Sequence, residues 1–150
     1  MHVEVCTDWR EWKPLRLEGL ADTPIGFGEL YADAVVLSDA EWEERWTRPG
    51  LRLIAYEGNH PVGMAGGFVG DDGPVLFGVY VRPAARGGDV LAALVDRVIA
   101  WCAPTPLRLA VHVDNHRAHA AYLKLGFVET GVRTPGGGID GRDLLEMVRG

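Results

Sequence analysis

Two short segments of the sequence combine residue types that could bind and transform a ligand. The first is a glycine turn, Arg86-Gly87-Gly88-Asp89, between a run of alternating apolar residues at 75–81 and an apolar stripe that begins at Val90. A turn that joins a strand to a helix points several backbone N–H groups one way, and the helix dipole adds to their field. The turn therefore predicts an anion site suited to a pyrophosphate, with Arg86 adding a charge-assisted contact. The alternative is an ordinary strand-to-helix connection.

The second segment runs from Asn115 to Phe127, and its informative residues are Asn115 and Tyr122. These two residues are about two helical turns apart, so both side chains can face one groove. A tyrosine hydroxyl can supply a proton, and an asparagine amide can both donate and accept hydrogen bonds. The structural alternative makes Asn115 a helix cap and Tyr122 a core residue.

Changes of hydrophobic period indicate the elements that must position these two segments. Strands are predicted at 2–6, at 51–56, 62–69 and 75–81 as an antiparallel meander, and at 107–113, 127–132 and 144–148. Helices are predicted at 9–20, with a kink or early turn at Pro14, at 38–46 from a capping box, at 90–102 and at 115–125. Residues 25–37 are ambiguous. The order β-α-α-β-β-β-α-β-α-β-β gives a mixed sheet with helices on both faces.

Taken together, the two segments resemble the motifs of the GNAT superfamily of N-acetyltransferases. The residues Val-Arg-Pro-Ala-Ala-Arg-Gly at 81–87 match the start of the motif V-x-P-x-x-(R/Q)-G-x-G-x-(G/A). Residues 115–127 match N-x-x-A-x-x-x-Y-x-(K/R)-x-G-F throughout. The resemblance covers nearly the whole chain. It implies an α/β (α+β) fold with a mixed, mostly antiparallel sheet of about seven strands.

The resemblance also implies acetyl-CoA as cosubstrate, transfer of its acetyl group to an amine, and a set of contact residues. Residues 79–81 would offer backbone groups to the pantetheine arm and the acetyl carbonyl, 86–91 would surround the pyrophosphate, and Asn115 would bond the pantetheine region. Tyr122 would protonate the departing thiolate as general acid. The implied cofactor-binding residues are Val79, Tyr80, Val81, Arg86, Gly87, Gly88, Asp89, Val90, Leu91, Asn115 and Tyr122.

The motifs do not identify the general base. An alkylamine is mostly charged at neutral pH, so a base or a water relay must remove its proton before attack. Family members often carry a glutamate on the fourth strand, but 75–81 holds no carboxylate. The candidates are Glu29 in the N-terminal region and His112 on the strand at 107–113, acting through water. A role without catalysis stays open for both.

Two residues depart from the family pattern, since Asp89 and Leu91 replace motif glycines. A carboxylate beside a pyrophosphate is unfavourable unless it points outward, and Asp is an apt helix N-cap, so we expect Asp89 to cap the helix that begins at Val90. Leu91 leaves less room for close approach of the backbone. These departures motivate a second hypothesis, a catalytically weak or inactive acyl-CoA-binding module.

Composition sets the outer bounds. The 150 residues suit one domain, 1–150, and the net charge of −6, without a Lys/Arg cluster, speaks against nucleic-acid binding. This acidity would attract a cationic acceptor, or would merely keep the protein soluble. We expect a small-molecule or peptide amine as acceptor, no membrane span, no signal peptide, no metal site, reduced cysteines and a cytoplasmic location. A homodimer is left open.

Overall fold

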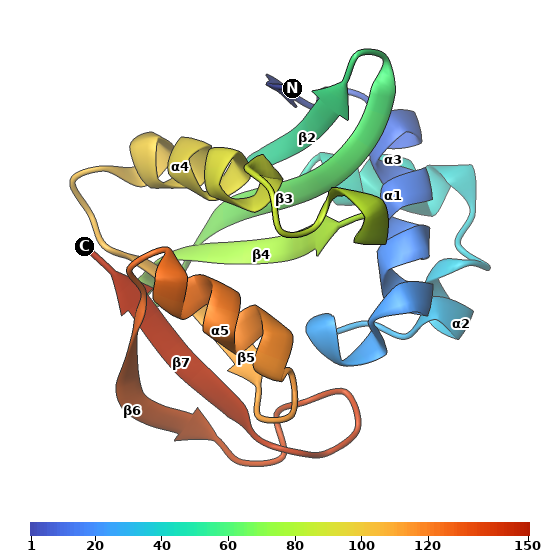
Figure 1. The fold of residues 1–150 in the computed structure, drawn as a ribbon. Coiled ribbons are helices and arrows are strands. Elements are labelled where there is room, and N and C mark those ends of the chain that lie inside the picture. Colours follow the sequence, from blue (N-terminus) through green and yellow to red (C-terminus); the bar gives the residue numbers. More distant parts are fainter.

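A seven-stranded sheet in the order β1-β2-β3-β4-β5-β7-β6 forms the centre of the computed structural model, which describes residues 1–150 (Figure 1). The strands pair antiparallel except β4 and β5, which are parallel. Their bounds are β1 His2–Val5, β2 Leu51–Glu57, β3 His60–Gly70, β4 Gly73–Val81, β5 Leu107–His112, β6 Val128–Thr134 and β7 Leu144–Arg149. The mixed, mostly antiparallel sheet is confirmed.

Five α-helices cover the sheet: α1 Trp9–Asp22, α2 Tyr31–Ala34, α3 Asp39–Trp46, α4 Val90–Cys102 and α5 His116–Lys124. The predicted order therefore lacked one helix. The short helix α2 lies in the ambiguous stretch 25–37, where one turn is too short to show a hydrophobic period. No helix is long and apolar enough to span a bilayer.

The core is divided between the two faces of the sheet. On one face α4, and Tyr122 of α5, pack with strand residues such as Leu53 and Leu109. On the other face α1 and α3 bring tryptophans onto Ile54 and its neighbours. Leu53 and Ile54 are adjacent in β2 and belong to different clusters, because successive strand side chains point to opposite faces. The predicted helices on both faces are confirmed.

Local sequence signals explain several helix boundaries. At the start of α3, Ser38 accepts from the backbone N–H of Glu41, and the Glu41 carboxylate accepts from Ser38, so the predicted capping box is confirmed. Pro14 does not end α1, which continues to Asp22. Both cysteines, Cys6 and Cys102, are free thiols.

Candidate functional site

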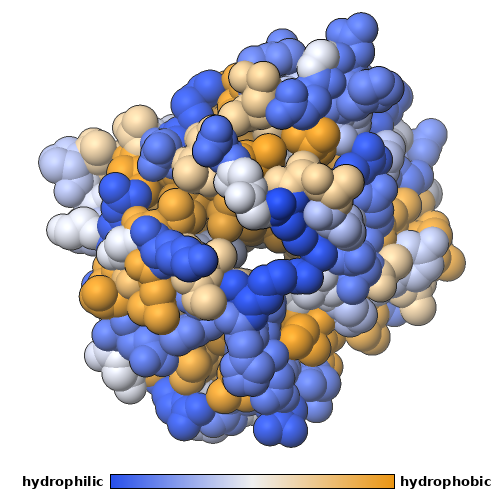
Figure 2. All heavy atoms as spheres, in the orientation of Figure 1, coloured by the Kyte–Doolittle hydropathy of each residue, from blue (hydrophilic) through white to orange (hydrophobic).

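The two central strands separate and leave a cavity between them. Val75 of β4 pairs with Arg108 of β5, and this is the only residue pair in the backbone ladder between these strands. Beyond Val75 the gap widens into a cavity of about 810 Å³, which α1, α5 and the loop before β7 help to line. Figure 2 shows the surface hollowed around a central opening that strongly hydrophilic side chains border.

A β-bulge turns β4 away from β5. The register between β3 and β4 shifts at Ala65, which faces two residues of β4, Gly78 and Val79. Gly78 has φ +62, a left-handed conformation that suits glycine in a bulge. Both residues line the cavity, so the bulge lies where the strands have separated. Backbone groups of β4 are therefore free to meet a ligand there.

The turn after β4 supplies a row of free donors. None of the backbone N–H groups from Gly87 to Ala92 has a hydrogen-bond partner, because they belong to the turn and to the first residues of α4. Gly87 has φ +80, which glycine permits, and nothing lies within 4 Å of a Cβ added there. This arrangement can bind an anion, as the sequence predicts.

Arg86 lies beside this row but already has partners. Its Nε donates to the carbonyl oxygen of Val81 at 2.9 Å, and its Nη2 donates to Oδ2 of Asp22 at 2.6 Å. The hydrogen bond from Arg86 is the main reason that the pKa of Asp22 is below its ordinary value. Arg86 also lines the cavity, so its charge is within reach of a ligand there.

The expectation for Asp89 was wrong in one respect. Asp89 occupies the N-cap position of α4, but its side chain makes no capping hydrogen bond. Its backbone is helical (φ −90, ψ −4), whereas a capping side chain normally requires an extended N-cap residue. Asp89 and Val90 do not line the cavity, and the Val90 side chain is buried in the core. Leu91 does line it.

The second motif faces the same cavity, since Asn115 and Tyr122 both line it. Oδ1 of Asn115 accepts from the backbone N–H of Ala118 at 3.4 Å, so this residue does cap α5, while its amide group stays unpaired. Tyr122 packs against Phe127 in the core, and its hydroxyl has no hydrogen bond within the chain. Burial raises the pKa of Tyr122 well above its ordinary value, so the hydroxyl stays protonated.

Tyr80 lines the cavity, but its side chain is held on the other side of the sheet. Its ring is buried among the residues of the α1 face, and its hydroxyl donates to Oε2 of Glu18 at 2.8 Å. Val79 and Val81, the other two predicted contacts on β4, also line the cavity.

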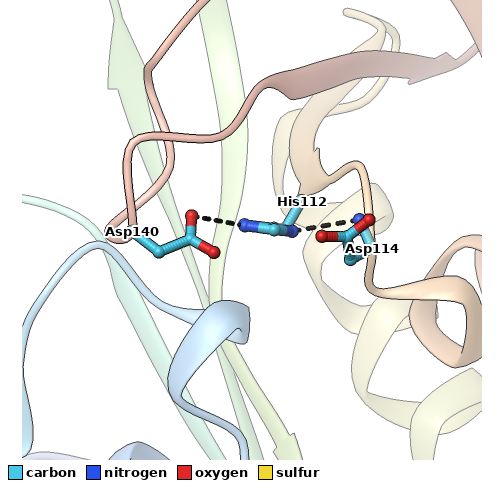
Figure 3. Close-up of side chains that lie close together, drawn as sticks. All are labelled: His112, Asp114 and Asp140. Carbon is cyan, nitrogen blue, oxygen red and sulfur yellow. Dashed lines mark hydrogen bonds and ion pairs between the residues drawn. The ribbon is translucent and has the colours of Figure 1, made fainter.

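His112 stands at the end of β5, between two aspartates (Figure 3). The backbone N–H of Asp114 donates to its Nδ1 at 3.0 Å, so the ring proton is on Nε2, which donates to Oδ1 of Asp140 at 2.7 Å. Both ring nitrogens are therefore engaged, and the side chain is fully buried. His112 lines the cavity, but with Nδ1 accepting from Asp114 and Nε2 carrying the proton, neither ring nitrogen has a free lone pair to accept a proton from an amine. This arrangement ties β5 to the loop before β7.

His112, Asp114 and Asp140 are also residue types that bind metals, and their ligand atoms lie within 4.8 Å of one another. Each of them has a partner in the protein, because Asp114 pairs with Nε of Arg142 at 2.8 Å. As arranged, these side chains hold the loop before β7 against the end of β5. The sequence analysis did not group these residues because Asp140 lies 28 positions beyond His112.

Glu29 lies outside the cavity lining, between two arginines. Arg45 donates to both of its carboxylate oxygens, and Nη2 of Arg16 donates to Oε1 at 3.3 Å. Burial alone would raise the pKa of Glu29, but the hydrogen bonds and charges of the two guanidinium groups hold it below its ordinary value. A carboxylate held ionised in this way is a poor proton acceptor.

Comparison with known families decides the relationship. The model of the acetyltransferase (GNAT) family matches residues 22–127. The chain belongs to the GNAT acetyltransferase family. No curated protein sequence matches it.

Solved GNAT structures share the fold over nearly the whole chain. A ribosomal-protein-alanine N-acetyltransferase from Brucella melitensis has a TM-score of 0.74 at 21% identity, covering 99% of each chain. A GNAT acetyltransferase from Streptococcus pneumoniae has a TM-score of 0.73 at 18% identity, and the match covers 99% of this chain and 97% of that chain. A phosphinothricin acetyltransferase from Sinorhizobium meliloti, in complex with acetyl-CoA, has a TM-score of 0.77 at 18% identity. The match covers 99% of this chain and 86% of that chain.

Several residues of this GNAT cavity were not predicted from the sequence, among them Gly78 and Arg16. Gly78 is an isolated glycine within a predicted strand, and this pattern often marks a bulge. Arg16 follows the buried Trp12 by one helical turn, so its charge falls on the packed face of α1, and it lines the cavity. A charged residue on the packed face of a helix could have indicated a residue of the site.

Proposed function

We propose that this protein is an acetyl-CoA-dependent N-acetyltransferase that passes the acetyl group directly to an amine in a ternary complex. The observation that carries the proposal is the cavity between β4 and β5, which ends at the free N–H row from Gly87 to Ala92. The GNAT family and the acetyl-CoA held by the Sinorhizobium neighbour support it.

The chemistry of the lining fits a polyanionic cosubstrate. Arg86, Arg117 and Lys124 come from the turn after β4 and from α5, and no Asp or Glu lines any part of the cavity. The lining is therefore positively charged, although the whole chain has a net charge of −6. The free N–H row, together with Arg86, would hold the pyrophosphate. Leu91 still leaves a cavity, and Asp89 lies outside it.

Bound acetyl-CoA would supply an activated acetyl thioester. Backbone N–H groups of β4 at the bulge, where no pairing with β5 remains, would donate to the acetyl oxygen as negative charge develops there. The amine nitrogen would bond to the acetyl carbon as the carbon–sulfur bond breaks. Tyr122 would give its hydroxyl proton to the leaving sulfur, for which its protonated state suits it.

The amine must lose its proton without a carboxylate in the cavity. Apolar and cationic surroundings disfavour an ammonium ion, so the lining lowers the pKa of an amine that binds there. We propose that the ammonium proton passes to solvent water before the amine binds in its neutral form. The second proton, released from the nitrogen as the amide forms, would pass through water to the Tyr122 oxygen, which has just given its own proton to the sulfur. Neither Glu29 nor His112 is needed in this scheme.

Isothermal titration with acetyl-CoA, followed by an assay of thiol release with a broad panel of amines, tests the proposal. We expect binding and amine-dependent release of free CoA. The second candidate, a binding module without turnover, is favoured by Asp89 and Leu91 in place of motif glycines. Binding with no thiol release on any amine would support that candidate, and absence of binding would contradict both.

A further inference from the structure

The charges at the α1 side of the cavity bear on which amine is accepted, given the proposed function. Arg16 is the one permanently charged residue that α1 contributes to the lining. Its side chain is only 15% exposed, and burial lowers the pKa of its guanidinium. A cation held so far from water is costly unless an anion faces it.

Arg16 lies against the bulge in β4. A Cβ added to Gly78 would lie 3.7 Å from Nη1 of Arg16, so the guanidinium lies close to the backbone of that glycine. The ring of Phe27 lies 5.0 Å from the guanidinium carbon, which fixes its position by stacking. The proposed function places the acetyl carbonyl at this bulge, so Arg16 is next to the reacting atoms.

The charge of Arg16 is only partly neutralised. Glu29 is shared by two guanidinium groups, so this cluster keeps one net positive charge. Arg45 takes contacts to both carboxylate oxygens, whereas Arg16 makes a single hydrogen bond of 3.3 Å. Nε and Nη1 of Arg16 have no hydrogen-bond partner. The geometry of a guanidinium suits a carboxylate, which can accept from two of its donors at once.

Apolar side chains also line the cavity, among them Phe27, which contacts the Arg16 guanidinium, Phe77, Ile139 and Leu144. No carboxylate is available there for a second ammonium group. We propose that the acceptor is a small amine that carries a carboxylate, such as a free amino acid with an apolar side chain, and that Arg16 binds this carboxylate. An acceptor with several ammonium groups does not fit this lining.

The test compares amines that share a side chain and differ at the carboxylate: leucine with leucinamide and isoamylamine, and phenylalanine with phenylalaninamide and phenethylamine. Because these changes also shift the amine pKa, kcat/KM is expressed for the neutral fraction of each amine. Hydrogen bonds to charged groups predict a preference of about 10- to 100-fold in kcat/KM for the amino acid. The Arg16→Gln variant should bring this ratio close to one, mainly through KM of the acceptor. Glu29→Gln, which leaves Arg16 unopposed, should raise the ratio.

Arg10→Gln is the matched control, because Arg10 is an exposed arginine of the same helix that does not line the cavity, and it should keep the wild-type ratio. Arg16→Lys keeps the charge and should keep part of the preference, which guards against a folding defect in Arg16→Gln. Equal rates with acid, amide and amine, or an unchanged ratio in a folded Arg16→Gln variant, would overturn the inference while leaving the acetyltransferase proposal intact. Failure to release thiol with every amine would instead overturn the proposed function and this inference with it.

Discussion

The two ends of the cavity are built in different ways. At the α4 end, one continuous segment supplies the turn, the free N–H row and Arg86. At the α1 end, the lining comes from separate parts of the chain, with Arg16 and Phe27 from the N-terminal region and Gly78 from β4. Backbone donors dominate the first end, and side chains the second.

This difference separates a site that tolerates many side chains from one that depends on particular side chains. A backbone anion site depends on a turn and a helix start, so many side chains are compatible with it. An acceptor site depends on the charge and shape of individual side chains, so one residue such as Arg16 can decide its selectivity. If the two ends are independent in this sense, a substitution at one end should leave the function of the other unchanged.

The largest effect is expected for Tyr122, which would act on the bond between the two bound groups. Tyr122→Phe removes the hydroxyl and keeps the ring, so kcat should fall by about 100- to 10,000-fold, a range typical of general acids. Binding of acetyl-CoA and the melting temperature should change little, since the hydroxyl has no partner in the protein. Tyr56→Phe, outside the cavity, is the control. Near-normal kcat in Tyr122→Phe would assign protonation of the sulfur to water.

A charge reversal at the α4 end should weaken acetyl-CoA specifically. Arg86→Glu puts a carboxylate beside the phosphates and beside Asp22, and loss of a charged hydrogen bond predicts about 10- to 100-fold weaker binding in isothermal titration. Arg97→Glu, on α4 but outside the cavity, makes the same change in net charge and should bind normally. Equal affinity in the two variants would remove Arg86 from the site.

At the α1 end, Glu29 should contribute to stability in a pH-dependent way. Its pKa is lowered in the folded state, so its contribution is fully present above its unfolded pKa of about 4.3 and is lost as pH falls through the folded pKa. Glu29→Gln should therefore lower the free energy of unfolding in urea by about 1 to 3 kcal/mol at pH 7. The difference from wild type should shrink below about pH 4.

The control for this measurement is Glu44→Gln, an exposed glutamate on α3. If Glu29→Gln abolishes turnover while its stability stays normal, Glu29 acts in catalysis and the ion-pair interpretation is wrong.

The smallest effect is expected for Asp89, at the α4 end. Two like unit charges about 4 Å apart in water repel each other by about 1 kcal/mol. Removal of the Asp89 charge in Asp89→Asn should therefore improve acetyl-CoA affinity by about fivefold at most. The missing capping bond means that little helix stability is lost. Asp96→Asn, on an exposed part of the same helix, should not change the affinity. A loss of affinity in Asp89→Asn would show that the carboxylate orders the turn.

Sequence analysis predicted the fold and the α4 end because both rest on local patterns. The strand–turn–helix at 75–102 and the capping box at Ser38 each depend on residues that are close together in the sequence. It missed α2, the Asp140 partner of His112 and the role of Glu29, because these depend on contacts between distant segments. Glu29, for example, meets Arg45 across 16 positions and Arg16 across 13.

The single pair of residues between β4 and β5 has a mechanical consequence. The sheet consists of two hydrogen-bonded halves, β1–β4 and β5–β7, and the halves are joined mainly by side-chain packing in the cluster that α4 completes. Apolar packing is non-directional, so it tolerates a small rotation that a ladder of hydrogen bonds would resist. We therefore expect a hinge motion about Val75 and Arg108 to meet less resistance than bending within either half of the sheet. A molecule that binds to both halves of the sheet would restrict this motion and make the whole protein more rigid.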